Sequence, residues 1–357
     1  MDLSKINKNI LISLTVVAVS FLILELFSRI FFLISDRDIK AFKKFPGRYI
    51  QSYFSGYKLS PNWVIENKQT KETINSFGFR SPEFQFSKSK DTYRIICLGS
   101  SIVYGTGKNN DTFPFQLEKE LNQLKKDGIN FEVINAGVPG YTSYHTMTQF
   151  LTSLVDLDPD LVVSYQLFTE MWYAWNLSFS EMNSDNFQPI NTSLSLKRIL
   201  DKSYFLILAS STFRKYKSNL IESKVHKYET KNFDESILNY FSRNINIIAM
   251  TCEYLNIDLV LSVPISLYKQ KNTEDEKNLI MDYENKEFYL KYIHKGKNIL
   301  KSISNEHSNV YYFDPSHYIK SDLNTLEDRY HPTIEGNMLL GKEFKNFITN
   351  SGVLSNK

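Results

Sequence analysis

From residue 93 onward, short apolar runs alternate with longer amphipathic stretches, and this alternation constrains the fold more than any other feature. The apolar runs predict strands over Tyr93–Leu98, Phe131–Asn135, Leu161–Leu167, Asp258–Val263 and Val310–Phe313. Helical patterns follow these runs at about residues 112–124, 144–157, 234–255 and 278–302, and from 333 onward. Strands that alternate with helices favour a parallel sheet covered on both faces. The sequence therefore predicts an α/β fold.

The N-terminus carries a long apolar segment. Residues 10–24 contain no charge, and the apolar pattern continues to Ile34, interrupted by Glu25 and Arg29. These two residues are four apart, so on a helix they share a face and can neutralise each other. The segment is long enough to span a bilayer, and no small-residue cleavage site of a signal peptide follows it. We predict an uncleaved single-pass membrane anchor over residues 1–35.

The rest of the chain divides into segments that differ in composition and in secondary-structure pattern. Residues 36–90 are a polar, aromatic juxtamembrane lead-in, and residues 91–350 form the main domain. Within that domain, residues 172–230 break the strand and helix rhythm and are predicted to be an insertion. Five basic residues follow the anchor between Arg37 and Arg48, whereas only Lys5 and Lys8 precede it. The charge rule thus favours a cytoplasmic body, against our expectation that the body is extracytoplasmic.

Composition excludes several functions. The net charge is only +3, and no basic stripe dominates the sequence, so nucleic acid is not an expected partner. Two cysteines, Cys97 and Cys252, make neither a disulfide framework nor a metal cluster. The aromatic content of 14% suits apolar contacts or sugar stacking, with core packing the simpler explanation.

Two short segments far apart in the sequence carry the candidate catalytic residues. Gly99 permits a tight exit from the first strand and delivers Ser101, with Ser100 as a competing nucleophile. Near the other end, Asp328 stands three residues before His331. A nucleophile, a base and an orienting carboxylate are the parts that an ester-cleaving site needs. A Gly-Ser loop without chemistry and a solvated histidine are the plain alternatives.

Three residues directly follow the first three predicted strands: Ser101, Gly137 and Thr169. In parallel sheets, sites form at the carboxyl ends of strands, which places these residues at one edge. The Gly137 N–H can turn toward a carbonyl oxygen, although a Gly-Pro turn without function explains it equally. Trp172 and Trp175 come next and are candidates to stack on a sugar or line an acyl pocket, with packing as the alternative.

Three blocks occur in a fixed order: Leu98–Gly105, Asn135–Tyr141 and Asp328–Pro332. They resemble motifs of the SGNH (GDSL-like) hydrolase superfamily. Upstream, Asn75–Arg80 resembles the lead-in of its membrane-anchored bacterial members. The resemblance implies a flavodoxin-like three-layer parallel sheet (the SGNH hydrolase fold) behind an N-terminal transmembrane helix. It also implies serine-dependent cleavage or transfer of an acyl group, with no metal or organic cofactor.

The resemblance assigns a role to each candidate. Ser101 is the expected nucleophile, His331 the base and Asp328 its orienter. The N–H groups of Ser101 and Gly137, with the Thr169 side chain, are the expected oxyanion hole.

Two positions depart from the superfamily pattern. Ser100 replaces an aspartate that is not the nucleophile, and Thr169 replaces an asparagine whose amide completes the oxyanion hole. Losing one oxyanion donor costs on the order of a hundredfold or more in rate. The sequence therefore supports an anchored esterase or O-acyltransferase acting on an acyl ester, with an acetylated envelope glycan as the expected substrate. The alternative is a binding or assembly protein of the same fold with little or no catalytic activity.

Overall fold

The computed structural model describes residues 3–35, 47–66, 71–124, 128–171, 202–209, 211–212, 236–280 and 283–354. The chain forms two compact units. One contains Met1–Gln51 and Pro189–Lys231, and the other contains Ser52–Gln188 and Asn232–Lys357.

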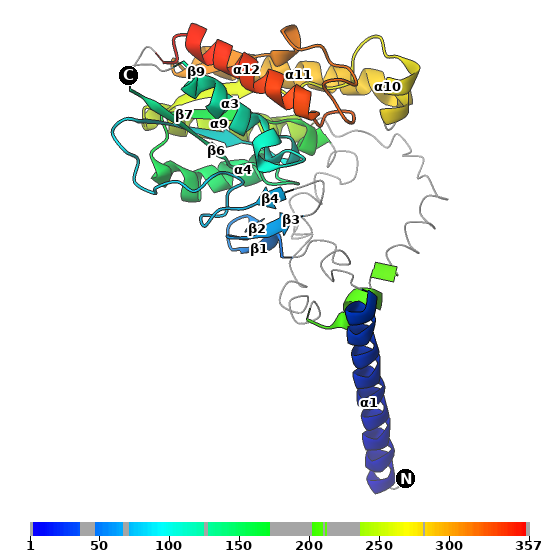
Figure 1. Ribbon diagram of the computed structural model, residues 1–357. Coiled ribbons are helices and arrows are strands. Elements are labelled where there is room, and N and C mark those ends of the chain that lie inside the picture. The colour runs from blue at the N-terminus through cyan, green and yellow to red at the C-terminus, as the bar shows by residue number, and fades with distance from the viewer. Residues whose placement is uncertain are drawn as a thin grey trace. The chain divides into compact units, whose positions relative to one another are not determined.

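The first unit is built on helix α1 (Leu3–Ser35), shown in blue in Figure 1. Its portion Lys8–Ser35 has 28 residues and includes an 18-residue window with a mean hydropathy of 2.6, so by length and composition it can cross a membrane. The unit also contains a short helix over residues 204–209 and most of strand β1 (Tyr49–Ser52). The predicted anchor is therefore a continuous helix of sufficient length.

The second unit contains a five-stranded sheet with every neighbouring pair parallel. Its strands are β5 (Thr92–Leu98), β6 (Asn130–Asn135), β7 (Leu161–Tyr165), β8 (Asp258–Ser262) and β9 (Val310–Phe313). The spatial order is β6-β5-β7-β8-β9. Counted along the chain this is the order 2-1-3-4-5, which defines the flavodoxin-like doubly wound sheet. The predicted fold class is confirmed.

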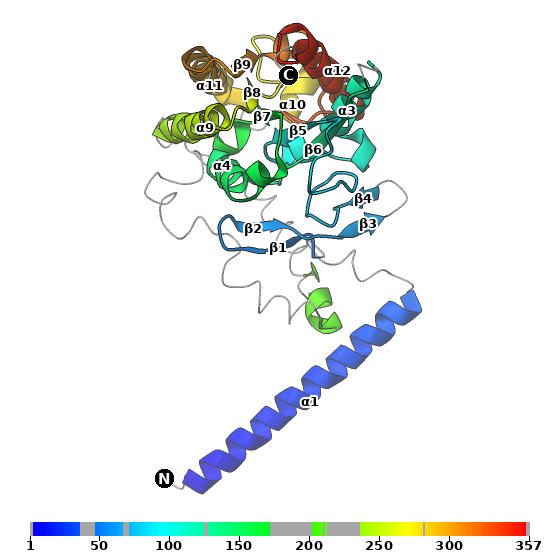
Figure 2. The same ribbon diagram turned by 90° about the vertical axis from the view of Figure 1, so that its left-hand side faces the viewer.

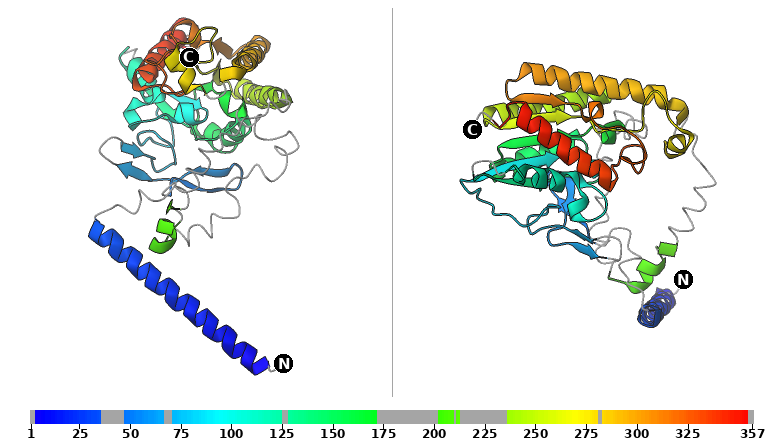
Figure 3. Two further views of the ribbon diagram at one scale, coloured as in Figure 1. Left: turned by 90° about the vertical axis from the view of Figure 1, so that its right-hand side faces the viewer. Right: turned by 45° about the horizontal axis from the view of Figure 1, so that its top comes forward.

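Helices cover both faces of this sheet (Figure 2). Helices α3 (Phe113–Asn122) and α12 (Ile334–Asn350) pack together on one face. Helices α4 (Ser143–Gln149), α9 (Ser236–Tyr254) and α11 (Lys286–Glu306) lie on the other, and Figure 3 shows the same layers from the opposite side. The sheet is thus the middle of three layers.

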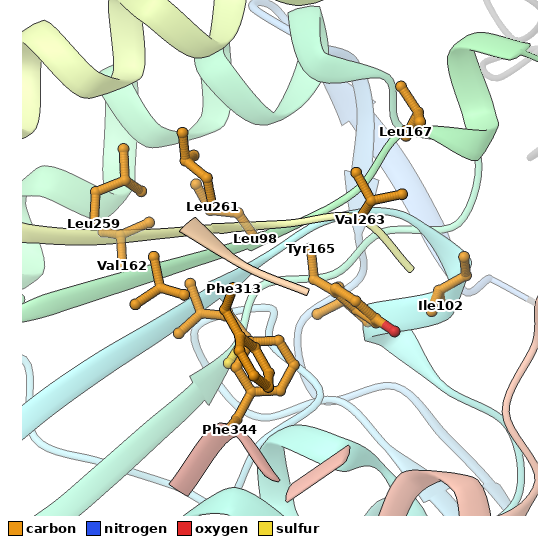
Figure 4. Close-up of a cluster of buried hydrophobic side chains, with 14 of the residues drawn as sticks. Leu98, Ile102, Val162, Tyr165, Leu167, Leu259, Leu261, Val263, Phe313 and Phe344 are labelled. Atoms are coloured by element: carbon orange, nitrogen blue, oxygen red, sulfur yellow. The ribbon is translucent and has the colours of Figure 1, made fainter. Parts of the chain in front are cut away.

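The hydrophobic core fills both interfaces of the sheet. All residues of β7 and β8 are buried, as expected for strands covered on both faces. Figure 4 shows Leu259 and Leu261 on one side of the sheet, and Tyr165, Phe313 and Phe344 on the other. The Phe344 ring from α12 contacts the Phe313 and Tyr165 rings, with centroids 4.9 and 5.5 Å away. This packing fixes the sheet edge at which the candidate site lies.

Several elements differ from the sequence-based expectation. The helix expected over 144–157 is α4 followed by a π-helical turn (Phe150–Leu154) and a 3-10 turn (Val155–Leu157). The helix expected over 278–302 begins as α10 (Glu274–Leu279) and resumes after a break as α11. The lead-in contains the short strands β2 (Gly56–Leu59), β3 (Val64–Glu66) and β4 (Lys71–Thr73). These strands are too short for a period-two pattern to stand out.

Candidate active site

Strand β5 ends at Leu98, and the chain turns at once into the short helix α2 (Ser101–Tyr104). Gly99 makes the turn possible, because a Cβ there would lie 2.3 Å from Val103 Cγ2 and 2.7 Å from the Tyr165 carbonyl oxygen. Ser100 is buried, whereas Ser101 is partly exposed at the start of α2. The turn therefore presents Ser101, rather than Ser100, at the carboxyl edge of the sheet.

Ser101, His331 and Asp328 form a continuous hydrogen-bonded chain. Ser101 Oγ lies 2.8 Å from His331 Nε2, although the two residues are 230 positions apart in sequence. On the other side of the ring, His331 Nδ1 lies 2.7 Å from Asp328 Oδ2. An ionised carboxylate only accepts hydrogen bonds, so Nδ1 carries the proton and Nε2 is left to accept the serine hydroxyl.

Asp328 is held by more than the imidazole. Its Oδ1 accepts the backbone N–H groups of Tyr330, at 2.9 Å, and His331, at 2.8 Å. Burial raises the pKa of the Asp328 carboxyl, but these bonds and the bond from the His331 ring outweigh it and hold the pKa below its usual range. The carboxylate is therefore ionised at neutral pH, as an orienting group has to be.

The loop that carries both residues is a small hairpin between β9 and α12. A bridge between Leu326 and Pro332 closes it, and the Glu327 N–H donates to the His331 carbonyl oxygen at 2.9 Å. Helix α12 lies directly against this hairpin. The approach is so close that a Cβ on Gly336 would lie 2.0 Å from the Thr325 carbonyl oxygen. The glycine thus lets the helix support the histidine loop at close range.

Gly137 lies against the nucleophile helix. A Cβ on Gly137 would stand 2.3 Å from the Tyr104 backbone nitrogen. Its N–H donates to Asn135 Oδ1 at 3.0 Å, and Asn135 Nδ2 donates to the Val103 carbonyl oxygen at 2.9 Å. The N–H that the resemblance assigns to the oxyanion hole is therefore engaged by a neighbouring amide, and it reaches a substrate oxygen only by turning from that partner.

Thr169 lies in the helical turn 168–171 that follows β7, and it is partly exposed. The neighbouring Phe168 ring stacks on the Tyr330 ring, with centroids 5.1 Å apart, so this turn packs against the His331 loop. The sheet thus brings the segments that carry Ser101, Gly137 and Thr169 to its carboxyl edge. Trp172 and Trp175 lie outside the described residues.

Arg80 is a residue that our reasoning on individual side chains missed. Its side chain is buried, and the guanidinium donates to the carbonyl oxygens of Tyr104 at 3.0 Å, Gly105 at 2.6 Å and Gly107 at 2.7 Å. It also lies 4.7 Å above the Tyr104 ring. Carbonyls at the end of a helix need such donors, so Arg80 fixes the end of the nucleophile helix. The signal was the motif Asn75–Arg80, which we noted only through the resemblance.

Glu170 follows Thr169, and its side chain is buried. Burial raises the pKa of its carboxyl to about 7, against the lowering effect of a hydrogen bond from the Ser143 N–H. Its second oxygen, Oε2, has no hydrogen-bond partner among the described residues. Ser143 is the first residue of α4, so Glu170 caps the helix that follows strand β6. Its role in the fold is to bind the loops after β6 and β7 together.

Within the described residues, no group of three or more His, Cys, Asp or Glu side chains is arranged to hold a metal ion. Cys97 and Cys252 are both buried free thiols, and burial raises the pKa of each. Among the described residues at the sheet edge, Ser101, His331 and Asp328 are the hydrogen-bonded set suited to nucleophilic chemistry.

Comparison with known proteins gives similar solved structures only. No family model matches the chain, and no curated protein matches it. The similar structures include a lipase/acylhydrolase from Enterococcus faecalis, which is 14% identical with a TM-score of 0.43; 72% of this chain and 96% of that chain are covered.

Two others are a GDSL-like lipase and an acetylxylan esterase. The lipase, from Bacteroides thetaiotaomicron, is 14% identical with a TM-score of 0.38, and the match covers 72% of this chain and 88% of that chain. The esterase, a catalytic mutant from Geobacillus stearothermophilus, is 13% identical with a TM-score of 0.43, and the match covers 72% of this chain and 94% of that chain.

Proposed function

We propose that this chain is a membrane-anchored serine esterase or O-acyltransferase acting on an acyl ester, with Ser101 as nucleophile. The observation that carries the proposal is the chain of contacts from Asp328 through His331 to Ser101, at 2.7 and 2.8 Å. Each contact has the length and the polarity that nucleophilic catalysis by serine requires. A solvated loop histidine would have no reason to meet a serine from the far end of the domain.

The reaction follows from this geometry. His331 Nε2 takes the hydroxyl proton as Ser101 Oγ attacks the ester carbonyl carbon, and Asp328 stabilises the imidazolium that forms. Nε2 then returns the proton to the leaving alkoxide, and the acyl group remains on Ser101. In the second half, Nε2 takes a proton from water or from an acceptor hydroxyl as that oxygen attacks the acyl carbonyl carbon. The bond from this carbon to Ser101 Oγ then breaks, and Nε2 returns the proton to Oγ. Hydrolysis and transfer differ only in that attacking group.

The proposed oxyanion hole has three donors. The Ser101 N–H at the start of α2 is the first donor, and the Thr169 hydroxyl is the second. The Gly137 N–H joins them once it turns from Asn135. A hydroxyl rotates and also accepts hydrogen bonds, so it is a poorer fixed donor than an amide. We therefore propose a slow enzyme, in which Thr169→Asn raises the turnover number.

The substrate class and the location belong to the same proposal. Helix α1 holds the chain at a membrane, and we propose that the body faces the extracytoplasmic side. An acetylated envelope glycan is the substrate proposed there. The tryptophans Trp172 and Trp175 remain candidates to stack on its sugar rings.

The second candidate function is binding or assembly without catalysis. Thr169 in place of an amide, together with the engagement of the Gly137 N–H, favours a binding or assembly protein that uses the same site without turnover. The two proposals differ in one simple assay. Full-length protein in detergent is incubated with 4-nitrophenyl acetate, beside Ser101→Ala and His331→Ala.

Release of nitrophenol that both variants abolish supports the enzyme. Release that both variants retain, or no release from folded protein, supports the binding protein. Ser100→Ala is the matched control, because it changes the neighbouring hydroxyl and leaves the contact between Ser101 and His331 in place.

A further inference from the structure

Four residues of α1 form a stripe along one face: Phe21, Glu25, Ser28 and Phe32. Their spacing of four, three and four residues is that of one helix face. Ser28 and Phe32 are buried, at 5% and 6% exposure, in a helix whose other apolar residues are mostly open. A small residue between larger ones is typical of contacts between helices in a membrane. Part of this face is therefore covered.

The described part of that cover is the short helix over residues 204–209, drawn in green beside the C-terminal end of α1 in Figure 1. The Phe205 ring meets the Phe21 ring edge to face, with centroids 5.8 Å apart. The Tyr204 ring meets the Phe32 ring in the same way at 5.6 Å. Both helices belong to the same compact unit, so the contact is internal to it.

Glu25 joins the two helices at the centre of the stripe. Its Oε2 accepts the Ser203 hydroxyl at 2.7 Å and the Phe205 N–H at 3.0 Å. Its Oε1 accepts the Tyr204 N–H at 3.1 Å and Arg29 Nε–H at 2.9 Å. The carboxylate is thus paired with a cation on its own helix and hydrogen bonded to the start of the other.

The first turn of the short helix has its backbone donors satisfied without water. Glu25 accepts two of the N–H groups, and the Ser203 hydroxyl accepts the Leu206 N–H at 3.2 Å. The Ile207 N–H donates to the Ser203 carbonyl oxygen at 3.1 Å. In water these donors can bond to solvent, whereas in hydrocarbon every backbone donor has to be satisfied within the protein. The junction is suited to a dry environment.

The sequence of the segment agrees. Residues 204–209 read Tyr-Phe-Leu-Ile-Leu-Ala, without a charge, and Lys202 precedes them. Glu25 itself lies ten residues before the end of α1, about 15 Å at the rise of an α-helix, so it is not at the helix end. Six helical residues extend about 9 Å, far less than the roughly 30 Å of a hydrocarbon core. A segment of this length enters and leaves on the same side.

We propose that residues 203–209 belong to a re-entrant membrane segment, seated on α1 through Glu25, whose outer surface contacts lipid acyl chains. The chain then holds the bilayer at two points, the α1 helix and the middle of the insertion. Glu25 and Arg29 are accordingly a docking pair rather than a defect in the anchor. The inference does not depend on the esterase proposal, since it uses only residues of the first unit.

The test is depth-dependent quenching of a fluorescent label in full-length protein reconstituted in phosphatidylcholine vesicles. A cysteine replaces Leu208 and carries an environment-sensitive NBD probe, and the native Cys97 and Cys252 are buried. We expect brominated acyl chains to quench the probe and aqueous iodide to spare it. A probe at Tyr53, which is 99% exposed, is the aqueous control, and one at Leu22 reports insertion of α1.

Glu25→Ala then separates docking from anchoring. With this change we expect the Leu208 probe to lose bromide quenching and gain iodide quenching, while the Leu22 probe stays lipid-quenched. Glu25→Gln keeps one acceptor oxygen and should give an intermediate result. A Leu208 probe that iodide reaches in the parent chain overturns the membrane location. A Leu208 probe that stays lipid-quenched in Glu25→Ala overturns the role of Glu25.

Discussion

Asp328→Asn is the most informative probe of the proposed catalytic arrangement. Asparagine has nearly the shape of aspartate, but an NH₂ group that donates hydrogen bonds replaces one oxygen that accepts them. The parent carboxylate accepts two backbone N–H groups through Oδ1 and the His331 ring through Oδ2. With its oxygen at the Oδ1 position, asparagine keeps both backbone bonds. Its NH₂ group then faces His331 Nδ1, and a donor cannot accept the ring proton.

The consequence for the reaction is a change of tautomer. His331 Nδ1 becomes the acceptor, Nε2 carries the proton, and the ring no longer accepts the hydroxyl proton of Ser101. The corresponding change in a serine protease triad lowers the turnover number about 10⁴-fold. A loss of this size corresponds to about 5 kcal/mol of activation free energy, at about 1.36 kcal/mol for each factor of ten. We expect a loss of this order in kcat for 4-nitrophenyl acetate.

Thermal unfolding by circular dichroism provides the structural control. Asp328→Asn should keep the melting temperature of the parent, because the two backbone bonds of the hairpin survive. Asp328→Ala removes these bonds as well, at about 1 kcal/mol each, and should melt lower. The reasoning is refuted if Asp328→Asn melts like the parent and retains its kcat within tenfold.

Three further variants address the support of the site. Gly336→Ala places a methyl group 2.0 Å from the Thr325 carbonyl oxygen, so the histidine loop has to shift; we expect a stability loss of about 1–3 kcal/mol and a lower kcat. Arg80→Lys cannot serve the three carbonyls that the guanidinium serves, one of them on Tyr104, and should lower kcat more than it changes KM. For Glu170→Gln we expect a flatter pH dependence of stability. The folded carboxyl holds its proton up to a pH of about 7 against a reference pKa of 4.5, so rising pH across that window should cost the parent about 3 kcal/mol through Glu170, a contribution that the variant lacks.

Each of these variants has its own control. Glu335→Ala changes the residue beside Gly336 on the same turn, and equal melting temperatures for the two alanine variants would contradict the contact we describe. For Arg80, a variant with parental kcat and a raised KM would contradict a positioning role. For Glu170, the free energy of unfolding in urea is compared at pH 5 and pH 8. Burial lowers the pKa of His145 to about 4, so this residue makes both proteins more stable as the pH rises. Its effect is the same in parent and variant and cancels in the comparison. Equal pH dependence of parent and variant would refute the assignment.

Strands were the part of the fold that the sequence predicted best. Val310–Phe313 is reproduced as predicted, and the other four strands of the sheet end within two residues of their predicted bounds. These segments are buried on both faces, so they are continuous apolar runs that periodicity detects easily. The break between α10 and α11 was missed, because amphipathic spacing continues across it and a capping box at Thr273 sets the earlier start.

The sequence predicted the candidate catalytic residues but not the contacts that support them. Ser101, Asp328 and His331 belong to short local motifs, and the resemblance of these motifs to the SGNH pattern predicted that they meet. The supporting contacts are long-range. Nothing in the local sequence indicates that Arg80 reaches the end of α2, or that Asn135 takes the Gly137 N–H. Such partners are decided by packing, which composition and spacing do not encode.

The central claim is that Ser101 is an activated nucleophile, and covalent labelling tests it most directly. Folded full-length protein is treated with a serine-reactive fluorophosphonate, digested and analysed by mass spectrometry for the modified peptide. The account predicts one modification, on Ser101, which disappears in His331→Ala because the base that removes the hydroxyl proton is gone. An unmodified Ser101 in folded protein, a label on Ser100, or undiminished labelling in His331→Ala would contradict it.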